Sequence, residues 1–370
     1  RNKLNEGGLK RILKHTSEQL QQRGRHGSWK DRRVVVVDGT GVSMPDTPDN
    51  QEEWPQPGSQ KPGCGFPQAR ICACFCLQTG ALLSYRVGSH RNGELTLLRQ
   101  QWDEFKPGDI MMGDKGFCSY YDVWKFQEKG VDTVMTLARR TPVEAGEATK
   151  VLGPDDLLIT WPKPAWNKNL RYSHEEWRSL PEQLNLRQIK VTITAPGMRS
   201  DCFYLVTTLT DASRYAASEL ADLYFQRWDV ELFFRDIKTT LGMEVLRCRS
   251  PAMVKKEILM HFIAYNAIRL LIVEAAAEAG HVARRLSFKG SVQALRQWEP
   301  QFSNESDPRA QRRLMDGLRS SIAGHLVPHR PGRREPRCVK RRPKPFALLT
   351  APRHQMIEIP HRSRYRANVA

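Results

Sequence analysis

Four polar side chains fall on one strip of a predicted helix in the segment YFQRWDVELFFRDIKTTLG, residues 224–242. At 100° per residue, their positions span about 60° of the helix circumference. The four are Tyr224, Arg227, Glu231 and Lys238. The strip borders an apolar face made of Leu223, Val230, Phe233, Phe234, Ile237 and Leu241. A carboxylate is therefore expected at the rim of a core, where it can hold a metal ion while the neighbouring cations bind phosphate.

Two further acids follow runs of strand-forming residues. Asp38 ends the β-branched run in RVVVVDGT (33–40), which is too continuous to be exposed on either side and predicts a central strand. Asp114 ends a shorter strand in KPGDIMMGDKGF (106–117). Each acid alone has an ordinary interpretation, as a turn or loop residue for the two aspartates and as a surface ion pair on a helix for Glu231.

The order of the predicted elements favours an α/β fold with a mixed sheet. The sequence predicts, in order, a helix (3–22), a strand (33–40), a two-stranded hairpin (69–88), a helix (92–105), a strand (106–114), a helix (119–130), a strand (131–138), a β-rich segment (139–217) and two helices (218–242 and 253–280). Three strands followed by alternating helices and strands suit a sheet with helices on its faces. In a ribonuclease-H-like sheet of this kind, the strand ends that carry Asp38 and Asp114 lie side by side. A helix packed on the sheet then brings Glu231 to them.

This order also predicts a division of the chain. Between the third predicted helix and the Glu231 helix, β-like runs replace helical periodicity, which indicates a β-rich insertion. Because the chain begins at Arg1, without a Met, we expect that an N-terminal portion is missing. The predicted parts are an N-terminal helical region (1–30), the first part of a ribonuclease-H-like domain (31–138), the insertion (139–217), the completion of that domain by the Glu231 helix (218–280) and a basic C-terminal region (281–370).

Three converging carboxylates suit metal-dependent phosphoryl transfer. Mg²⁺ is bound in proteins by a few carboxylates together with water and substrate phosphate oxygens. Two such ions can activate the attacking oxygen and stabilise the leaving one in an in-line displacement, so no covalent protein nucleophile is needed. In this scheme Asp38 bridges both ions, and Asp114 and Glu231 each complete one coordination shell. The strip residues would bind the DNA strand: Tyr224, Arg227 and Lys238.

The spacing of the strip residues resembles a known family signature. Tyr, two residues, Arg, three residues, Glu, six residues and Lys is similar to the YREK signature of the DDE transposases of bacterial insertion sequences, in the insertion sequence four family. VVVVDGT (34–40) resembles the first catalytic block of that family, and GDKGF (113–117) resembles the second, usually written ADRGF. Two proline-rich segments, QPGSQKPGCGFP and RPGRREPRCVKRRPKP, resemble further parts of it. The resemblance covers most of residues 30–350.

The resemblance implies a function. Members of the family cut DNA at the ends of an element and join the 3′ hydroxyl to target DNA, acting as a homodimer on paired ends with Mg²⁺, for which Mn²⁺ may substitute. By resemblance, Asp38, Asp114 and Glu231 are the metal-binding triad. The chain departs from the family pattern at Gly113 and Lys115, which replace the commoner Ala and Arg, and the N-terminal DNA-recognition domain is expected to be truncated.

The charge distribution points to a polyanionic partner. The formal net charge is +18, and residues 281–370 hold 20 Lys and Arg against 6 Asp and Glu. In HRPGRREPRCVKRRPKP (329–345) cations alternate with prolines, so an extended backbone can follow a phosphate backbone as a strap. The alternative is a solvated tail. The residues predicted to contact DNA in this segment are Arg341, Arg342 and Lys344.

The remaining features exclude other classes of protein or leave them open. The eight cysteines lack CxxC spacing and are expected to be small buried residues rather than zinc ligands. No run of 18 or more apolar residues and no signal peptide is visible, so no membrane contact and a cytoplasmic, nucleoid-associated location are expected. Two alternative functions stay open: a catalytically silent DNA-binding derivative, and a nuclease of the same fold that cuts without joining.

Overall fold

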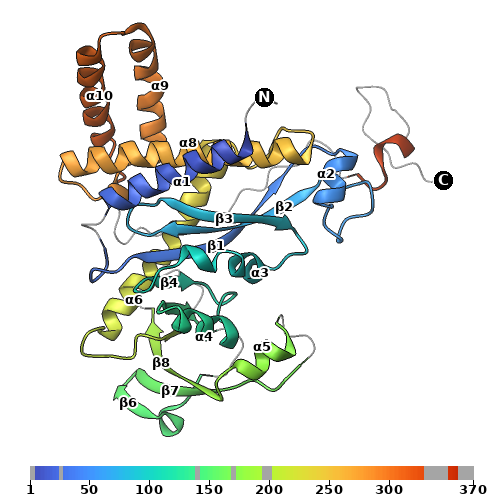
Figure 1. The fold of residues 1–370 in the computed structure, drawn as a ribbon, viewed down its shortest axis with the longest axis vertical. Coiled ribbons are helices and arrows are strands. Elements are labelled where there is room, and N and C mark those ends of the chain that lie inside the picture. Colours follow the sequence, from blue (N-terminus) through green and yellow to red (C-terminus); the bar gives the residue numbers. More distant parts are fainter. Residues whose placement is uncertain are drawn as a thin grey trace.

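The strands of the protein form one mixed sheet (Figure 1). The computed structural model describes residues 5–24, 28–137, 142–167, 172–193, 202–328 and 349–356. The strand order is β3-β2-β1-β4-β5-β9-β8-β7-β6. The strands are β1 Val34–Ser43, β2 Gln68–Cys76, β3 Leu82–Ser89, β4 Ile110–Gly113, β5 Asp132–Thr136, β6 Lys150–Gly153, β7 Asp156–Pro162, β8 Gln183–Thr192 and β9 Cys202–Thr207.

Helices cover both faces of this sheet. Figure 1 shows α1 and α8 on one side and α3 and α4 on the other. The helices are α1 Glu6–Arg23, α2 Pro48–Glu53, α3 Glu94–Arg99, α4 Tyr120–Glu128, α5 His174–Ser179, α6 Ala217–Phe225, α7 Asp229–Arg235, α8 Pro251–Glu278, α9 Phe288–Asn304 and α10 Pro308–Ala323.

The centre of the sheet has the predicted ribonuclease-H-like arrangement. β1 pairs antiparallel with β2 and parallel with β4, β2 pairs antiparallel with β3, and β4 pairs parallel with β5. The predicted mixed sheet flanked by helices is therefore confirmed. The strands of the segment predicted as an insertion extend the same sheet, because β9 pairs with β5 and β8 pairs with β9.

The valine run of β1 separates two hydrophobic cores. Val34 and Val36 belong to the core shared with α6, α7 and α8, whereas Val35 and Val37 belong to the core shared with α3 and α4. All four side chains are at most 1% exposed. A strand buried on both faces reads as a continuous apolar run, which is why the sequence predicted β1 correctly.

The segment predicted as one regular helix from residue 218 to 242 changes its hydrogen-bond pattern three times. After α6 comes a 3₁₀ turn at Gln226–Trp228, then α7, then a π-helical turn at Asp236–Thr240. In the last turn, Leu241 N donates to Asp236 O at 3.0 Å, an i→i+5 bond. Gly242, at φ +81°, ends the helix. The apolar face is nevertheless buried as predicted, because small changes in the number of residues per turn move side chains only slightly around the helix.

The first predicted helix after the hairpin, over residues 92–105, begins later than predicted. Asn92 lies before it, where its Oδ1 accepts a hydrogen bond from Ser89 N at 2.8 Å and closes a turn. The cap residue is Gly93, and α3 is shorter than predicted. The proline-rich stretch 45–67 contains a further short helix, α2, whose cap is Thr47.

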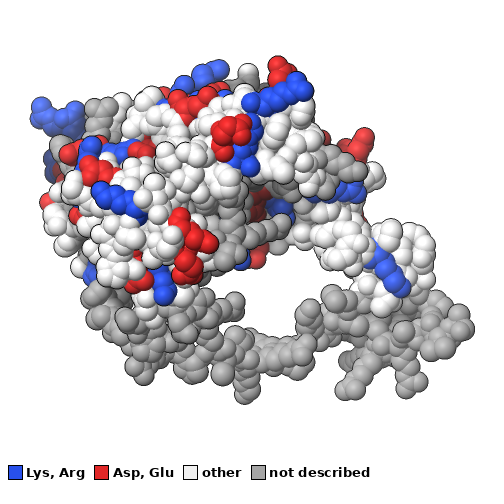
Figure 2. Space-filling model, turned by 90° about the horizontal axis from the view of Figure 1, so that it is seen from below, with Lys and Arg blue, Asp and Glu red and all other residues white. Residues whose placement is uncertain are grey.

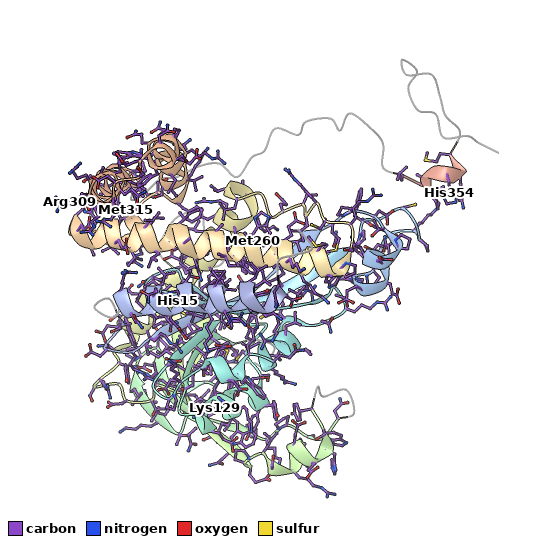
Figure 3. The ribbon with its side chains drawn as sticks, turned by 45° about the horizontal axis from the view of Figure 1, so that its top comes forward. His15, Lys129, Met260, Arg309, Met315 and His354 are labelled. Carbon is purple, nitrogen blue, oxygen red and sulfur yellow. The ribbon has the colours of Figure 1, made fainter. Side chains whose placement is uncertain are left out.

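The sequence did not predict the two helices that follow α8. α9 and α10 form a hairpin that projects from α8 in Figure 1, and Figure 3 shows Arg309 and Met315 on α10. α8, which carries Met260, runs beside α1, which carries His15 (Figure 3). By length and apolar composition α8 could cross a membrane, yet 56% of its most apolar stretch is buried inside the protein. This burial is typical of a core helix.

Candidate active site

The register of the central strands aligns the two predicted catalytic aspartates. β1 and β4 run parallel, with Val34 opposite Ile110 and Val36 opposite Met112. Continued by two residues, this register sets Asp38 opposite Asp114. Because side chains alternate along a strand, these positions share the sheet face of Val36 and Met112, which is the face that α7 covers.

Asp38 is a mostly buried carboxylate with little compensation for its charge. Its side chain is 15% exposed, and its Oδ2 lies 3.9 Å from Nη1 of Arg227. Its Oδ1 accepts a hydrogen bond from Gly39 N at 2.7 Å. Burial raises the pKa of Asp38 to about 6, against the lowering effect of the Gly39 N–H, and the charges of Glu231 and Asp114 raise it further. Proton binding at Asp38 thus depends on both other predicted acids.

Glu231 approaches this position from the helix packed on the sheet. Val230, Phe233 and Phe234 bury the inner side of α7 against the sheet, which leaves Glu231 exposed beside them. The Glu231 carboxylate makes no hydrogen bond or ion pair with the residues that the structure describes. Its charge contributes to the raised pKa of Asp38, on the strand against which α7 packs.

Asp114 lies just beyond the end of β4. Its Oδ1 accepts a hydrogen bond from Gly116 N at 2.7 Å, within the turn that leads to α4. Its charge acts to raise the pKa of Asp38 and also the pKa of Tyr224. Asp114 is therefore electrostatically coupled to groups from β1 and from α6.

Tyr224 and Arg227 form a packed pair beside the acids. The guanidinium carbon of Arg227 lies 5.7 Å from the centre of the Tyr224 ring. Tyr224 is only 8% exposed, and its hydroxyl lies 3.2 Å from Oγ1 of Thr136. Burial raises the pKa of Tyr224, which the neighbouring Arg227 counteracts. The helix wheel placed Tyr224 on the strip that borders the apolar face, and in the structure its ring is buried beside the guanidinium of Arg227.

Within the described part of the chain, the structure gives no contact between the three acids and the other predicted DNA-binding residues. Lys238 lies on the π-helical turn, half-buried, and its ammonium group makes no ion pair or hydrogen bond within the described ranges. Arg341, Arg342 and Lys344 lie outside the described residues. Their predicted contacts with DNA stay predictions.

The donor set suits a hard divalent cation. Asp38, Asp114 and Glu231 offer only carboxylate oxygens, the ligands that Mg²⁺ prefers. Across the described ranges, no three His, Cys, Asp or Glu side chains are gathered as closely as a ready-made metal site requires. A bound cation would offset the charges that contribute to the raised pKa of Asp38. The three residues fit the cation in chemistry and charge.

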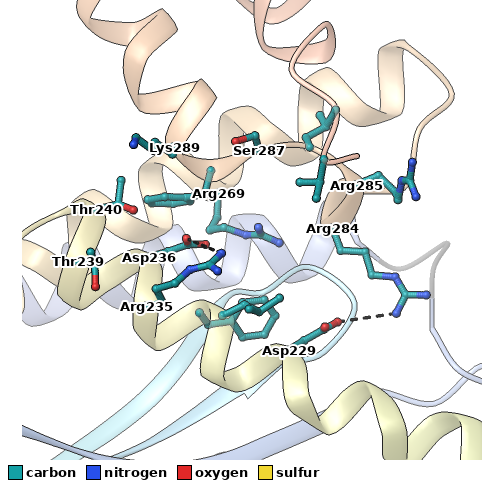
Figure 4. Close-up of a pocket in the computed structure, with 15 residues that line it drawn as sticks. Asp229, Arg235, Asp236, Thr239, Thr240, Arg269, Arg284, Arg285, Ser287 and Lys289 are labelled. Carbon is teal, nitrogen blue, oxygen red and sulfur yellow. Dashed lines mark ion pairs between the residues drawn. The ribbon is translucent and has the colours of Figure 1, made fainter. Parts of the chain in front are cut away.

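A separate cavity of about 470 Å³ lies on the other side of α7 (Figure 4). None of the three predicted catalytic acids lines it. Arg284 pairs with Asp229 at 3.8 Å, and Arg235 lies 4.0 Å from Asp236. Burial raises the pKa of Asp236 to about 6, against the opposing charges of Arg269 and Arg235. This cavity is partly apolar and holds its own acids, so it is distinct from the carboxylate site.

Charge is mixed on the surface that Figure 2 shows. Lys and Arg side chains are interspersed there with Asp and Glu, and no single-sign patch covers that face of the described part. The formal charge of +18 belongs to the whole chain and is concentrated in its last quarter. The excess of basic residues is therefore not gathered on this face of the described part.

Comparison with known proteins identifies the family. Residues 29–267 match the family model described as "Transposase DDE domain". The chain belongs to the DDE transposases. This match confirms the predicted family and spans Asp38, Asp114 and Glu231, although it assigns no role to any of them.

Individual relatives are transposases of insertion sequence elements. The chain is 26% identical over 360 residues to "Transposase InsG for insertion sequence element IS4" of Escherichia coli K12, covering 95% of this chain and 77% of that protein. It is 35% identical over 60 residues to "Transposase for insertion sequence element IS421" of Escherichia coli, covering 16% of each. A piggyBac transposase from a synaptic complex with hairpin DNA aligns with a TM-score of 0.42 and 10% identity over 78% of this chain and 57% of that one. That last likeness is too small to add to the fold described above.

Proposed function

We propose that this DDE transposase cleaves DNA at the ends of an insertion element and joins the freed 3′ hydroxyl to target DNA. The observation that supports the proposal best is the parallel register of β1 and β4, which aligns Asp38 with Asp114 on the sheet face that α7, the helix of Glu231, covers. Asp38 is mostly buried, and the charges of Glu231 and Asp114 contribute to its raised pKa, which suits cation binding better than a structural role.

A pair of divalent cations, Mg²⁺ or Mn²⁺, would supply charge neutralisation to the attacking and leaving oxygens of an in-line displacement. Asp38 is the proposed shared ligand, with Asp114 and Glu231 as the outer ones. Arg227, backed by the Tyr224 ring, is proposed to hold a phosphate beside the scissile bond, because a guanidinium binds phosphate oxygens in a fixed fork. Lys238 is proposed to bind a flanking phosphate.

The assembly and location are part of the same proposal. The transposase acts as a homodimer on paired element ends, and it works in the cytoplasm in association with the nucleoid. The basic C-terminal segment contributes sequence-independent affinity through phosphate contacts.

The substitution Glu231→Gln tests the proposed role of the helix carboxylate. It removes the charge but keeps the shape, so cleavage of element-end DNA in Mg²⁺ or Mn²⁺ should fall to background while DNA affinity stays nearly unchanged. Asp222→Asn, on an exposed position of α6, is the control and should cut as the wild type does. Cleavage that persists in Glu231→Gln would remove Glu231 from the mechanism.

The products of the same assay separate this proposal from its alternatives. Cleavage together with strand joining is the expected result for the wild type. Cleavage without joining would favour a nuclease of this fold, and DNA binding without cleavage would favour a silent derivative.

A further inference from the structure

A pair of hydroxyl groups joins the end of β5 to the end of α6. Oγ1 of Thr136, the last residue of β5, lies 3.2 Å from the hydroxyl oxygen of Tyr224. Among the described residues, the structure gives the Thr136 hydroxyl no other hydrogen-bond partner. Tyr224 is 8% exposed, whereas Thr136 is only partly buried. Thr136 is therefore the more accessible member of the pair.

The register of the sheet places Thr136 beside one of the predicted catalytic acids. β4 and β5 run parallel, with Gly113 opposite Met135. Continued by one residue, this register sets Thr136 opposite Asp114. Side chains alternate along β5, and Val134 belongs to the core that α6 and α7 share, so Thr136 lies on the same face. Thr136 is thus one strand away from Asp114, on the face that α7 covers.

Arg227 supplies a donor without a partner next to the same tyrosine. Its guanidinium carbon lies 5.7 Å from the centre of the Tyr224 ring, and its Nε is buried without a hydrogen-bond partner in the described residues. Its ion pair with Asp38 spans 3.9 Å, which is too long for a hydrogen bond. A buried donor of this kind is costly unless a ligand provides an acceptor. The surroundings of Tyr224 therefore suit an acceptor such as a phosphate oxygen.

The burial of the two hydroxyls determines which of them is available to a ligand. In a hydrogen-bonded pair of hydroxyls, one proton lies between the oxygens and the other is free to donate outward. Because Tyr224 is the buried member, its hydroxyl is placed to donate to Oγ1 of Thr136, which leaves the proton of Thr136 for a ligand. The oxygens of a DNA phosphate accept hydrogen bonds and carry no proton to donate, so they suit this free donor.

We infer that Thr136 binds a phosphate of the cleaved DNA strand through its hydroxyl, and that Tyr224 orients this hydroxyl by donating to it. The inference rests on the proposed function, since it concerns the same DNA strand. The bound phosphate lies next to the scissile one, because Thr136 lies beside Asp114. Tyr224 then acts indirectly, supporting Arg227 with its ring and Thr136 with its hydroxyl.

DNA binding by the whole chain in chelator tests this contact without the reaction. Thr136→Val removes the hydroxyl but keeps the shape, so the Kd for an element-end duplex, measured by fluorescence anisotropy, should rise about tenfold. Thr136→Ser keeps the hydroxyl and should bind within about twofold of the wild type. Thr160→Val is the matched control, because Oγ1 of Thr160 also pairs with a hydroxyl, that of Thr149 at 3.0 Å, but on β7, which β8 and β9 separate from β5. It should bind as the wild type does.

Duplexes with a single neutral methylphosphonate separate a DNA contact from a structural role. Phosphates next to the scissile one are replaced one at a time. At one position the wild type and Thr136→Val should bind within about twofold of each other, because both lack the same contact. A tenfold difference that persists at every position would make Thr136 structural and overturn the inference. Wild-type affinity of Thr136→Val for the unmodified duplex would overturn it as well.

Tyr224→Phe tests the orienting bond, since it keeps the ring beside Arg227 and removes only the hydroxyl. Binding should weaken by part of the loss seen in Thr136→Val, and the double variant should bind no more weakly than Thr136→Val alone. Additive losses, in variants that thermal melts show to be folded, would overturn the orienting role.

The cleavage assay keeps this inference distinguishable from the proposed function. Cleavage by the wild type in Mg²⁺, together with unchanged binding in Thr136→Val, would overturn the inference alone. Weaker binding in Thr136→Val, with a wild type that binds element ends but does not cut them, would overturn the proposed function and leave the phosphate contact standing.

Discussion

At the scale of single residues, the candidate site holds a carboxylate that is poorly suited to a folded protein without cations. Asp38 is largely buried and faces the charges of Asp114 and Glu231, with Arg227 only at 3.9 Å. Residues placed for function in this way are often destabilising for the fold. The same feature makes the site testable through stability as well as through catalysis.

Asp38→Asn should stabilise the cation-free protein above neutral pH. The pKa of Asp38 in the folded protein is about 6, above its ordinary value of 3.8, so the folded state holds its proton longer than the unfolded state. The contribution of Asp38 to the free energy of unfolding is fully present below about pH 4 and is lost as the pH rises through 6. At pH 8 the substitution should therefore raise the free energy of unfolding by about 3 kcal/mol, and by little at pH 4, as urea titrations in chelator would measure.

Asp236→Asn is the matched control for this prediction. Asp236 has a pKa raised to about 6 by burial as well, but it lies in the separate cavity behind α7. It should give a similar gain at pH 8 while cleavage of DNA is kept, whereas Asp38→Asn should lose cleavage. An Asp38→Asn protein that is no more stable than the wild type at pH 8 would contradict the uncompensated charge.

Arg227→Lys tests the guanidinium rather than the charge. Lysine keeps the positive charge but loses the planar fork and its packing on the Tyr224 ring. Cleavage should fall by roughly two orders of magnitude while DNA affinity changes by no more than about threefold, because one phosphate contact among several is altered. Equal losses of binding and cleavage would assign Arg227 a general binding role instead.

At the scale of elements, the packing of α7 determines where Glu231 lies. Phe234 packs edge-on against Phe75 of β2, with ring centres 5.3 Å apart, and Phe233 lies 5.4 Å from the same ring. These aromatic contacts join the helix that carries the glutamate to the sheet that carries Asp38. Losing one of them should affect both stability and geometry.

Phe234→Ala should therefore destabilise the protein by about 3–5 kcal/mol, through the lost burial and the cavity left behind. In conditions where the variant is still folded, cleavage should fall more than DNA affinity, because α7 is free to shift. Phe234→Leu retains most of the volume and should recover most of both properties. If Phe234→Ala cut at the wild-type rate when folded, the packing of α7 would not set the position of Glu231.

Local sequence patterns predicted the elements that hold the site but not every detail of them. β1, the hairpin of β2 and β3, α4 and α8 follow from apolar periodicity and turn residues, which act over short distances. The π-helical turn after α7, and the pairing of β9 with β5, depend on contacts distant in sequence.

At the scale of the whole molecule, the basic charge is concentrated toward the C-terminus. Residues 281–370 hold 20 Lys and Arg against 6 Asp and Glu. Counterions released from DNA phosphates make such binding depend steeply on salt. The C-terminal segment is therefore expected to set overall affinity, and the carboxylate site to set the chemistry.

Neutralising Arg341, Arg342 and Lys344 together should flatten the dependence of DNA affinity on salt by about three units of slope, one for each lost phosphate contact. Affinity would be measured by fluorescence anisotropy between low and moderate salt. The matched control neutralises three exposed cations of the described part, Lys14, Arg178 and Lys190. An unaltered slope in the C-terminal variant, or an equal change in the control, would count against a DNA strap.

The most direct measurement of the central claim is anomalous diffraction from crystals of the protein with element-end DNA and Mn²⁺. The expected result is Mn²⁺ density about 2 Å from carboxylate oxygens of Asp38, Asp114 and Glu231, with the side chains drawn together around it. Mn²⁺ density elsewhere on the protein, with those three carboxylates still apart and DNA in place, would contradict the account.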